Sequence, residues 1–554
     1  MFKRSKDANQ QDIFASIPSM LQGQAYEQYN DENAWHNIFR SQLLGRIDET
    51  LFKPLYDQTT GAPNAPIRIL VGMLSLKEGF GWSDHELYTE CRFNLLVRSA
   101  LGLCNINDSI PVESTYYLFR KRLHDYQKET GEEIIEKVFR EITKGQVIDF
   151  HVNGRRIRMD SKLIGSNIAW CTRYEIIHNA LVSFYKAFKG TLNLKLSREL
   201  RKELEEIALT ESKKLVYSKN REEIQKSLQS LGILADKILN ALDEHDNENY
   251  GMLKRVFGEH FRVNGTGGVD TLPKEEIKSG SVQNPNDTEC AFRDKDGQKV
   301  KGYSANLTET CDEDSLNLIL DVQLLPVNTP DVDFFQPGIT NSSEVLGQVP
   351  SKVHSDGAYQ SPENVWFCQE REINYFFNGI QGKPGRYDLN LEDDKLIVTD
   401  TQTGAIIPAN KTKSGKWSIK TDDGKPRYFA QKEIDTCTLR KQIENMPFNE
   451  RNKRNNIEAT IFQFCYHTRN NKTRYRGLIK NKMWATLRCI WINLKRIVKY
   501  IGQNVGKSLK MSQNMLKNAG FSEKQHRFLT FCHILEIISA FFGYGKFFRL
   551  KFQF

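Results

Sequence analysis

The segment from Arg451 to Lys510 contains fifteen Lys and Arg residues and a single carboxylate, Glu458. An acid in such a cationic field is expected to be ionised. The segment therefore predicts a surface that binds polyanions, with one anionic side chain available to hold a metal ion. The alternative is a solvated helix face on which the lone Glu has no special role.

Two aspartates upstream extend this candidate site. A strand is predicted over Val152 to Asp160, and a second strand, which begins at Val353, ends at Asp356. If a helix carrying Glu458 covers one face of the sheet, the three carboxylates can converge. Each aspartate also precedes Ser or Gly, which is common turn chemistry, so either one alone has a structural explanation.

Three converging carboxylates would suit a hard cation. Mg²⁺ takes oxygen ligands and retains water and phosphate oxygens, which is the arrangement expected for phosphodiester chemistry. A pair of such ions activates the attacking oxygen and stabilises the leaving oxygen. Asp321, in a buried apolar run, and the Asp312–Asp314 cluster are rival acids, the latter more simply a solvated loop. His354 is expected to pack within its strand.

Length and composition limit the other classes of function. The 554 residues, 39% hydrophobic and 27% charged, can form several domains of a soluble globular protein. No GxGxxG or GxxxxGK[ST] motif is present, which disfavours a dinucleotide or P-loop nucleotide site. The ten cysteines are scattered without a CxxC pair, which disfavours a zinc ribbon and a disulfide framework.

Charge and hydropathy indicate nucleic acid as the partner. The net charge is +9 and the pI is about 8.8, and the basic residues are clustered. A membrane surface would also attract this charge, but the most apolar stretch, Phe528 to Gly545, contains His533 and Glu536 and is better interpreted as a buried or amphipathic helix. The polar N-terminus lacks a signal-peptide pattern, so we expect a cytoplasmic protein without a membrane partner.

Helical and strand-like patterns alternate along the chain. The N-terminal region is predicted to be all-helical, with a capping box formed by Ser83 and Glu86 and a third helix that ends in the basic Phe119–Arg122. Such helices suit a helix-turn-helix-like DNA reader, although small helical domains more often simply pack. The expected divisions are a tail (1–33), a helical domain (34–148), core segments (149–170, 282–382 and 446–510), a helical insertion (171–281), a β-rich insertion (383–445) and a helical extension (511–554).

Four stretches together resemble the insertion-sequence transposases of the DDE superfamily, and the resemblance covers most of the chain. The stretches are Arg158-Met159-Asp160-Ser161-Lys162-Leu163-Ile164, Lys301-Gly302-Tyr303 with Thr308-Glu309-Thr310-Cys311, Ser355-Asp356-Gly357-Ala358-Tyr359, and Arg454-Asn455-Asn456-Ile457-Glu458. The resemblance implies an α/β fold, with an RNase H-like core of mixed sheet and flanking helices interrupted by the helical and β-rich insertions.

The same resemblance assigns roles to particular residues. It implies that Asp160, Asp356 and Glu458 bind two Mg²⁺ ions, for which Mn²⁺ could substitute. Many such transposases place Arg four residues before the Glu on the same helix face, as Arg454 does here. This chain departs from the pattern at Arg451, where relatives have Tyr, and at Cys465, where they have Lys. Relatives often carry a Cys-rich insertion, but only Cys437 lies in that region here, so no structural zinc is predicted.

We therefore predict a DNA transposase that exposes a 3′-hydroxyl at each element end and joins it to target DNA. Tyr475, Trp484 and Trp491 could stack on unpaired bases, although the two tryptophans have the spacing of core residues. A homodimer is expected on DNA because two ends must be joined in one complex. The alternatives are a nuclease that does not join strands and an inactive DNA-binding derivative. The predicted phosphate contacts are Arg454, Lys472, Arg474, Arg476, Lys480 and Lys482.

Overall fold

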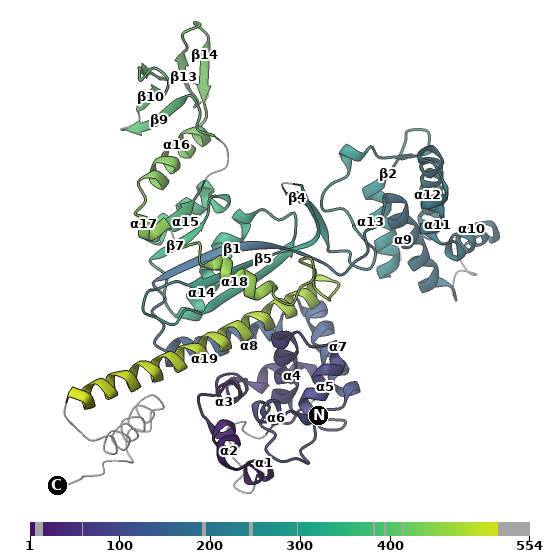
Figure 1. The fold of residues 1–554 in the computed structure, drawn as a ribbon. Coiled ribbons are helices and arrows are strands. Elements are labelled where there is room, and N and C mark those ends of the chain that lie inside the picture. The colour runs from purple at the N-terminus through teal and green to yellow at the C-terminus, as the bar shows by residue number, and fades with distance from the viewer. Residues whose placement is uncertain are drawn as a thin grey trace, which may run out of the picture.

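A mixed β-sheet lies at the centre of the molecule, with helices on both of its faces (Figure 1). The computed structural model describes residues 1–5, 15–57, 59–190, 196–242, 247–295, 297–379, 383–392, 395–412, 415–451 and 453–518. The strand order is β4-β5-β1-β7-β8, and β6 also pairs with β5. The strands are β1 (Arg156–Gly165), β4 (Ala291–Lys295), β5 (Gln298–Thr310), β6 (Ile319–Pro326), β7 (Lys352–Asp356) and β8 (Asn374–Asn378).

Strand direction changes across β1. On one side β1, β5 and β6 are antiparallel, whereas on the other side β7 and β8 run parallel to β1. The prediction that a strand ends at Asp160 is wrong, because the ladder to β5 holds β1 extended as far as Gly165. The ladder to β7 stops earlier, at the pair Arg158–His354. Asp160 therefore lies just where β1 loses its parallel neighbour. The predicted strand end at Asp356 is confirmed.

Different helices cover the two faces of the sheet. On one face, Gly338 lies so close to Thr308 of β5 that a Cβ at this position would be 3.0 Å from the Thr308 hydroxyl oxygen, which brings the covering helix tightly onto the sheet. On the other face, Thr460 donates a hydrogen bond to Glu309 of β5. The covering helices are α8 (Ile134–Asp149) and α14 (Phe335–Leu346) on the first face, and α17 (Phe448–Arg451) and α18 (Ile457–Cys465) on the second.

The N-terminal helices share one hydrophobic core with the sheet. The predicted capping box is confirmed, because the Ser83 hydroxyl accepts a hydrogen bond from the Glu86 amide and the Glu86 carboxylate accepts one from the Ser83 amide. The third helix does not end at Arg122 but continues to Thr130, which places its basic residues in mid-helix. These helices are α1 (Ser16–Met20), α2 (Gly23–Asn30), α3 (Trp35–Gln42), α4 (Ile67–Phe80), α5 (Asp84–Phe93), α6 (Leu95–Ala100) and α7 (Glu113–Thr130).

One long helix, α19 (Leu478–Asn518), joins the N-terminal helices to the sheet (Figure 1). Asn493 exchanges hydrogen bonds of 2.8 Å with the backbone of Ile319 at the start of β6. Trp491 packs against Gly79 of α4 so closely that a methyl group at position 79 would overlap the indole ring. Trp484 and Trp491 are buried, as their spacing predicted for core residues, and Tyr475 is buried as well.

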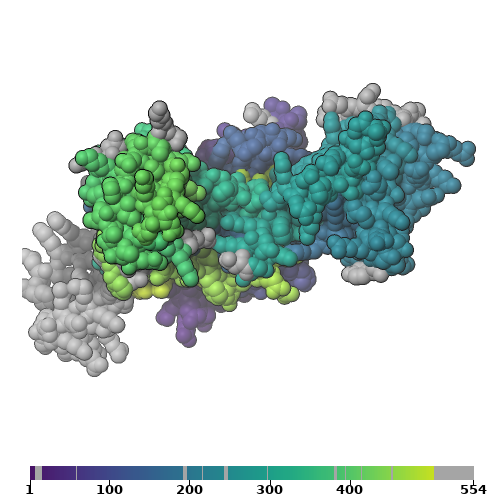
Figure 2. Space-filling view, turned by 90° about the horizontal axis from the view of Figure 1, so that it is seen from above, coloured from purple at the N-terminus to yellow at the C-terminus, as the bar shows by residue number. Residues whose placement is uncertain are grey.

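A helical insertion with its own hydrophobic core separates β1 from β4. Its buried residues extend from Tyr174 to Val282, and Figure 2 shows it at one end of the molecule. Its elements are α9 (Arg173–Phe188), α10 (Arg198–Leu209), α11 (Ser212–Ser218), α12 (Arg221–Ala241), α13 (Glu248–His260), β2 (Phe261–Val263) and β3 (Val269–Thr271).

A second insertion, rich in strands, follows β8 and lies at the opposite end of the molecule (Figure 2). Two three-stranded sheets pack around a small core that includes Trp417, Phe429 and Ile434. Its elements are β9 (Tyr387–Glu392), β10 (Lys395–Asp400), β11 (Ile406–Pro408), β12 (Asn410–Lys411), β13 (Trp417–Lys420), β14 (Pro426–Phe429) and α16 (Gln431–Glu444), and α15 (Pro362–Glu370) precedes β8.

Within the described ranges, no helix has the length and apolar character that a membrane crossing requires. The stretch Phe528 to Gly545, predicted to be a buried or amphipathic helix, lies outside the described residues.

Candidate active site

Asp160 and Asp356 meet at one guanidinium group. They are separated by the same sequence interval as the paired residues Arg158 and His354, so the parallel register brings them to the same level of adjacent strands. Arg454 lies between them, with one terminal nitrogen 3.0 Å from Asp160 Oδ2 and 3.5 Å from Asp356 Oδ2. The structure thus brings together two of the three predicted carboxylates and one of the predicted phosphate contacts.

The two aspartates differ in their exposure to solvent. The Asp160 side chain is 13% exposed, whereas that of Asp356 is 41% exposed. Burial raises the pKa of Asp160, and the nearby Asp356 adds to this effect, whereas the Arg454 cation opposes it. A backbone amide also donates to each carboxylate, from Ser161 at 2.9 Å and from Gly357 at 2.6 Å. Because these amides fix both side chains, a cation placed between them faces preoriented oxygens.

Glu458 lies on the helix that covers this face but does not join the pair. It is exposed in the first turn of α18, whose buried residues Ile457, Thr460 and Phe464 face the interior. Among the described residues, no group of three or more Asp, Glu, His or Cys side chains could hold a metal ion. Arg454 precedes α18 rather than sharing a helix face with Glu458, because the chain makes a turn there in which the Ile457 amide donates to the Arg454 carbonyl.

A buried ionic cluster around Glu309 supports α18. Glu309 accepts hydrogen bonds from Arg158 and Arg496, each at 2.6 Å, and from the Thr460 hydroxyl at 2.8 Å. Burial would raise the pKa of Glu309, but the two guanidinium groups outweigh it and lower the pKa. The cluster connects β1, β5, α18 and α19, so it fixes the helix that carries Glu458 against the strand that carries Asp160.

A second buried acid, Glu450, fixes α17 on the same face. Its carboxylate lies 2.9 Å from Lys352, 3.3 Å from the His354 imidazole and 3.7 Å from Arg156. His354 is fully buried and stacks on Phe376 with ring centroids 4.8 Å apart. Burial lowers the pKa of His354 to about 4. His354 therefore packs within the sheet, as predicted, and neither Glu309 nor Glu450 was identified from the sequence.

The rival acids lie away from the aspartate pair. Asp321 pairs with Thr308 on β5 and so faces α8 and α14. It accepts hydrogen bonds from Gln323 at 2.9 Å and Asn341 at 3.0 Å, and burial raises its pKa to about 7. Asp312, just after the end of β5, is buried, so the prediction of a solvated loop is wrong for this residue; it accepts a long hydrogen bond of 3.4 Å from the Arg156 amide. Neither acid contacts Asp160 or Asp356.

The other predicted phosphate contacts are placed in three ways. Lys472 and Arg476 donate to the carbonyls of Ile168, at 3.2 Å, and Asn167, at 2.8 Å, and Arg474 donates to the carbonyl of Trp82. These three bonds fasten the loop before α19 to the end of β1 and to the N-terminal helices. Lys482 faces the buried Glu133, and Lys480 is exposed to solvent. Their contacts with DNA stay predictions.

Lys162 is a candidate that the sequence analysis did not select. It lies two residues after Asp160 on β1, so both side chains project from the same face of the strand. Its charge acts on Cys465, whose pKa burial raises to about 11. Lys162 makes no hydrogen bond or ion pair within the described part of the chain. Glu458 and Cys465 are two helical turns apart on the same side of α18. Because Lys162 lies near Cys465, it lies on the side of α18 that also carries Glu458. Strand alternation from Asp160 could have identified it.

Comparison with known protein families adds an independent finding. Residues 26–122 match a family described as Transposase domain (DUF772), and residues 413–498 match one described as Transposase DDE domain. Both families are transposases, which act on DNA. Together the two matches support, more particularly, an insertion-sequence transposase of the DDE class. No curated protein and no solved structure matches the chain.

The matched segments include only part of the candidate site. Arg454 and Glu458 lie within the second match, whereas Asp160 and Asp356 lie outside both. The two matched segments nevertheless form one body, because α4 of the first packs on α19 of the second. A DDE domain implies a nuclease or transposition enzyme.

Proposed function

We propose that the chain catalyses metal-dependent cleavage at the 3′ ends of an insertion sequence and transfer of those ends to target DNA. The observation that carries the proposal is the convergence of Asp160 and Asp356, from adjacent parallel strands, on a single cationic group. The arrangement of the sheet supports an RNase H-like core, because β4 and β6 pair antiparallel with β5, β5 pairs antiparallel with β1, and β7 and β8 run parallel to β1. The division into core, helical insertion, β-rich insertion and helical N-terminal and C-terminal parts belongs to the same proposal.

The donor set fits a hard divalent cation in part. Two preoriented carboxylates that already share the Arg454 cation offer the oxygen ligands that Mg²⁺ or Mn²⁺ prefers. Asp160, Asp356 and Glu458 would hold two such ions, which would activate the attacking oxygen and stabilise the leaving oxygen of a phosphodiester. Glu458 must turn inward from its exposed position to complete this set.

The remaining residues hold and orient the substrate in this proposal. Arg454 offsets part of the negative charge of the aspartate pair and would be available to contact a phosphate once cations occupy the pair. The amides of Ser161 and Gly357 keep the two carboxylates oriented. The DNA backbone would be held by Lys472, Arg474, Arg476, Lys480 and Lys482, and two copies of the chain would bring the two element ends together.

A cleavage assay on a duplex that carries the element end tests this function. We expect a nick at the 3′ end with Mg²⁺ and no nick with EDTA, and joined products when target DNA is added. Cleavage without joined products would indicate a nuclease, and binding without any cleavage would contradict the enzymatic proposal.

A further inference from the structure

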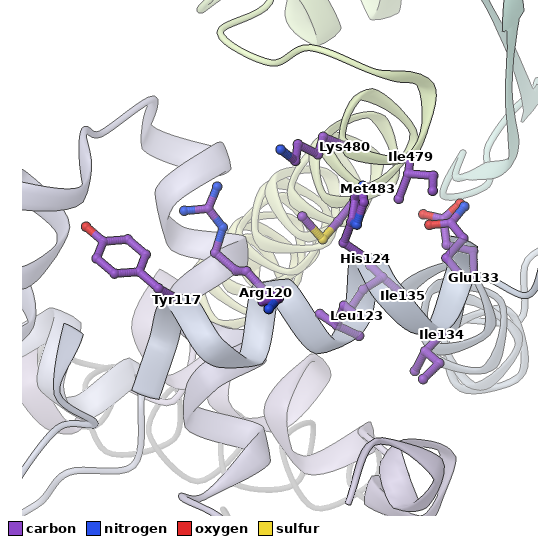
Figure 3. Close-up of a pocket in the computed structure, with 12 residues that line it drawn as sticks. Tyr117, Arg120, Leu123, His124, Glu133, Ile134, Ile135, Ile479, Lys480 and Met483 are labelled. Atoms are coloured by element: carbon purple, nitrogen blue, oxygen red, sulfur yellow. The ribbon is translucent and has the colours of Figure 1, made fainter. Parts of the chain in front are cut away.

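A cavity of about 300 Å³ lies between α7, the start of α8 and the start of α19 (Figure 3). One wall comes from α7, whose residues up to 122 lie in the first matched transposase segment, and from the beginning of α8, and the other wall belongs to the second matched segment. Its floor consists of apolar side chains from all three helices. These are Leu123, Ile134, Ile135, Ile479 and Met483.

Cationic side chains surround this apolar floor. Arg120 and Lys121 come from α7, and Lys480 comes from α19 on the opposite wall (Figure 3). Lys121 and Lys480 are exposed, and neither makes a hydrogen bond or ion pair within the described ranges of the chain. Two ammonium groups on opposite sides of one cavity, without anionic partners, favour an anionic ligand that spans them.

A single carboxyl group, that of Glu133, lines the same cavity. Burial raises its pKa to about 8, so the group is largely neutral at neutral pH and does not cancel the surrounding charge. The Thr486 hydroxyl donates a hydrogen bond of 3.4 Å to Glu133 Oε1, and the side chain of Gln127, which also lines the cavity, makes a second hydrogen bond to the carboxyl group. A neutral acid can both donate and accept a hydrogen bond, as the polar edge of a nucleobase requires.

We propose that this cavity binds one unpaired nucleotide of the DNA substrate, with the base on the apolar floor and the flanking phosphates at Lys121 and Lys480. A duplex backbone alone needs only a charged surface, whereas an apolar cavity fits a base that has left its stack. The volume lies at the small end of ligand pockets, which suits one base rather than a duplex. This inference rests on the proposed function, because it takes DNA as the substrate.

Binding measurements in EDTA test the site apart from catalysis. The probes are a fluorescent duplex with one bulged nucleotide and the same duplex fully paired. We expect the wild-type chain to bind the bulged duplex about tenfold more tightly, the scale of one stacked base. Met483→Trp fills the cavity and should abolish this preference while leaving binding to the paired duplex unchanged.

Lysine variants test the phosphate contacts without disturbing the core. Lys121→Ala and Lys480→Ala should each lower the salt dependence of binding to the bulged duplex by about one unit of slope. Lys144→Ala is the matched control, because Lys144 is an exposed lysine further along α8 and makes no described ion pair; its slope should not change. Since Lys121 and Lys480 are both exposed, their variants are expected to fold even if Met483→Trp does not.

Three results would overturn the proposal. The first is equal affinity of the wild-type chain for the two duplexes. The second is an unchanged preference for the bulged duplex in a folded Met483→Trp variant. The third is displacement of the bulged duplex by free deoxyadenosine monophosphate, which would assign the cavity to free nucleotides. Asp160→Asn should retain the preference for the bulged duplex. A chain that prefers the bulge but never nicks DNA would contradict the proposed function alone, and one that nicks DNA without that preference would contradict this site alone.

Discussion

On the two faces of the central sheet, the pKa values of buried acids are shifted in opposite directions. Under α17 and α18, Glu309 and Glu450 are each surrounded by two or more cationic side chains, and the pKa of each is lowered. Under α8 and α14, Asp321 receives two amide donors and a distant guanidinium, Arg140 at 3.8 Å, and its pKa rises to about 7. Cations on the first face therefore favour the ionised form of its buried acids, whereas burial on the second face favours the protonated form of Asp321.

Asp160 lies on the first face but does not share the lowered pKa values of Glu309 and Glu450. Burial raises the pKa of Asp160, and the Arg454 cation opposes this shift. The divalent ions of the proposed function would lower that pKa, because a bound cation favours the ionised carboxylate.

The sharpest test exchanges one aspartate on each face for asparagine. Asp160→Asn should lower the cleavage rate by about 10³-fold or more, the scale of losing an electrostatic stabiliser of the transition state. Asp321→Asn should retain near wild-type cleavage, because Asp321 lies on the opposite face of the sheet from the pair. Rates of nicking with Mg²⁺ measure both effects. Similar losses in the two variants would show that the faces do not differ as described.

Stability should also distinguish an acid held by cations from an exposed one. Glu309→Gln leaves Arg158 and Arg496 buried without an anion and should lower the free energy of unfolding by about 3–5 kcal/mol. Glu313→Gln is the matched control, because the Glu313 side chain that pairs with Lys453 is 69% exposed and its replacement should change stability far less. Urea unfolding measures both, and equal effects would argue against the buried cluster.

The acids of the two faces should respond to pH with opposite sign. Asp321 has a folded pKa near 7 against an ordinary value of 3.8, so the folded state binds the proton more tightly than the unfolded state. Its contribution to stability is therefore favourable at low pH and is lost as the pH rises from about 4 to about 7. Glu309, whose pKa is lowered, contributes stability that is lost as the pH falls through its folded pKa.

Urea midpoints of the wild type and Asp321→Asn across this pH range isolate the Asp321 contribution. The variant should lose less stability than the wild type as the pH rises from about 5 to about 8. If the two proteins lost stability in parallel, Asp321 would not have the raised pKa that its burial implies.

The smallest expected effect concerns Lys162 at the edge of the charged face. Lys162→Ala should weaken DNA binding about tenfold and lower the salt slope by about one, because an unpaired ammonium beside the aspartates would contact a phosphate. Lys162→Arg should restore most of the binding, since it keeps the charge. A fluorescence assay with duplex DNA in EDTA measures both variants, and an unchanged slope in Lys162→Ala would remove this residue from the site.

Local signals in the sequence predicted local structure well. The Ser83 capping box, the strand end at Asp356 and the buried positions of Trp484 and Trp491 each depend on a few neighbouring residues, and all three were found as expected. The mixed α/β class followed from the same kind of pattern. The interval between Asp160 and Asp356 could be noted in the sequence, but only the parallel register of β1 and β7 explains why it brings the two residues level.

Features that depend on distant partners could not be predicted in this way. The extension of β1 beyond Asp160 is imposed by β5, whose residues lie well over a hundred positions away. The clusters of Glu309 and Glu450 likewise join segments from separate parts of the chain, and no local pattern marks an acid that will be buried between two arginines. The inward turn that Glu458 would need is a property of α18 packing rather than of its sequence.

The contact between Gly79 and Trp491 has a consequence for how this protein can be divided or recombined. The Trp491 indole occupies the space that any side chain at position 79 would need. The N-terminal helices and α19 must therefore come from the same protein, or from proteins that both keep this glycine and this tryptophan. A chimera that took one of these pieces from a relative with a bulkier residue at that crossing would separate the two halves of the nucleotide cavity, even though every residue lining it was retained.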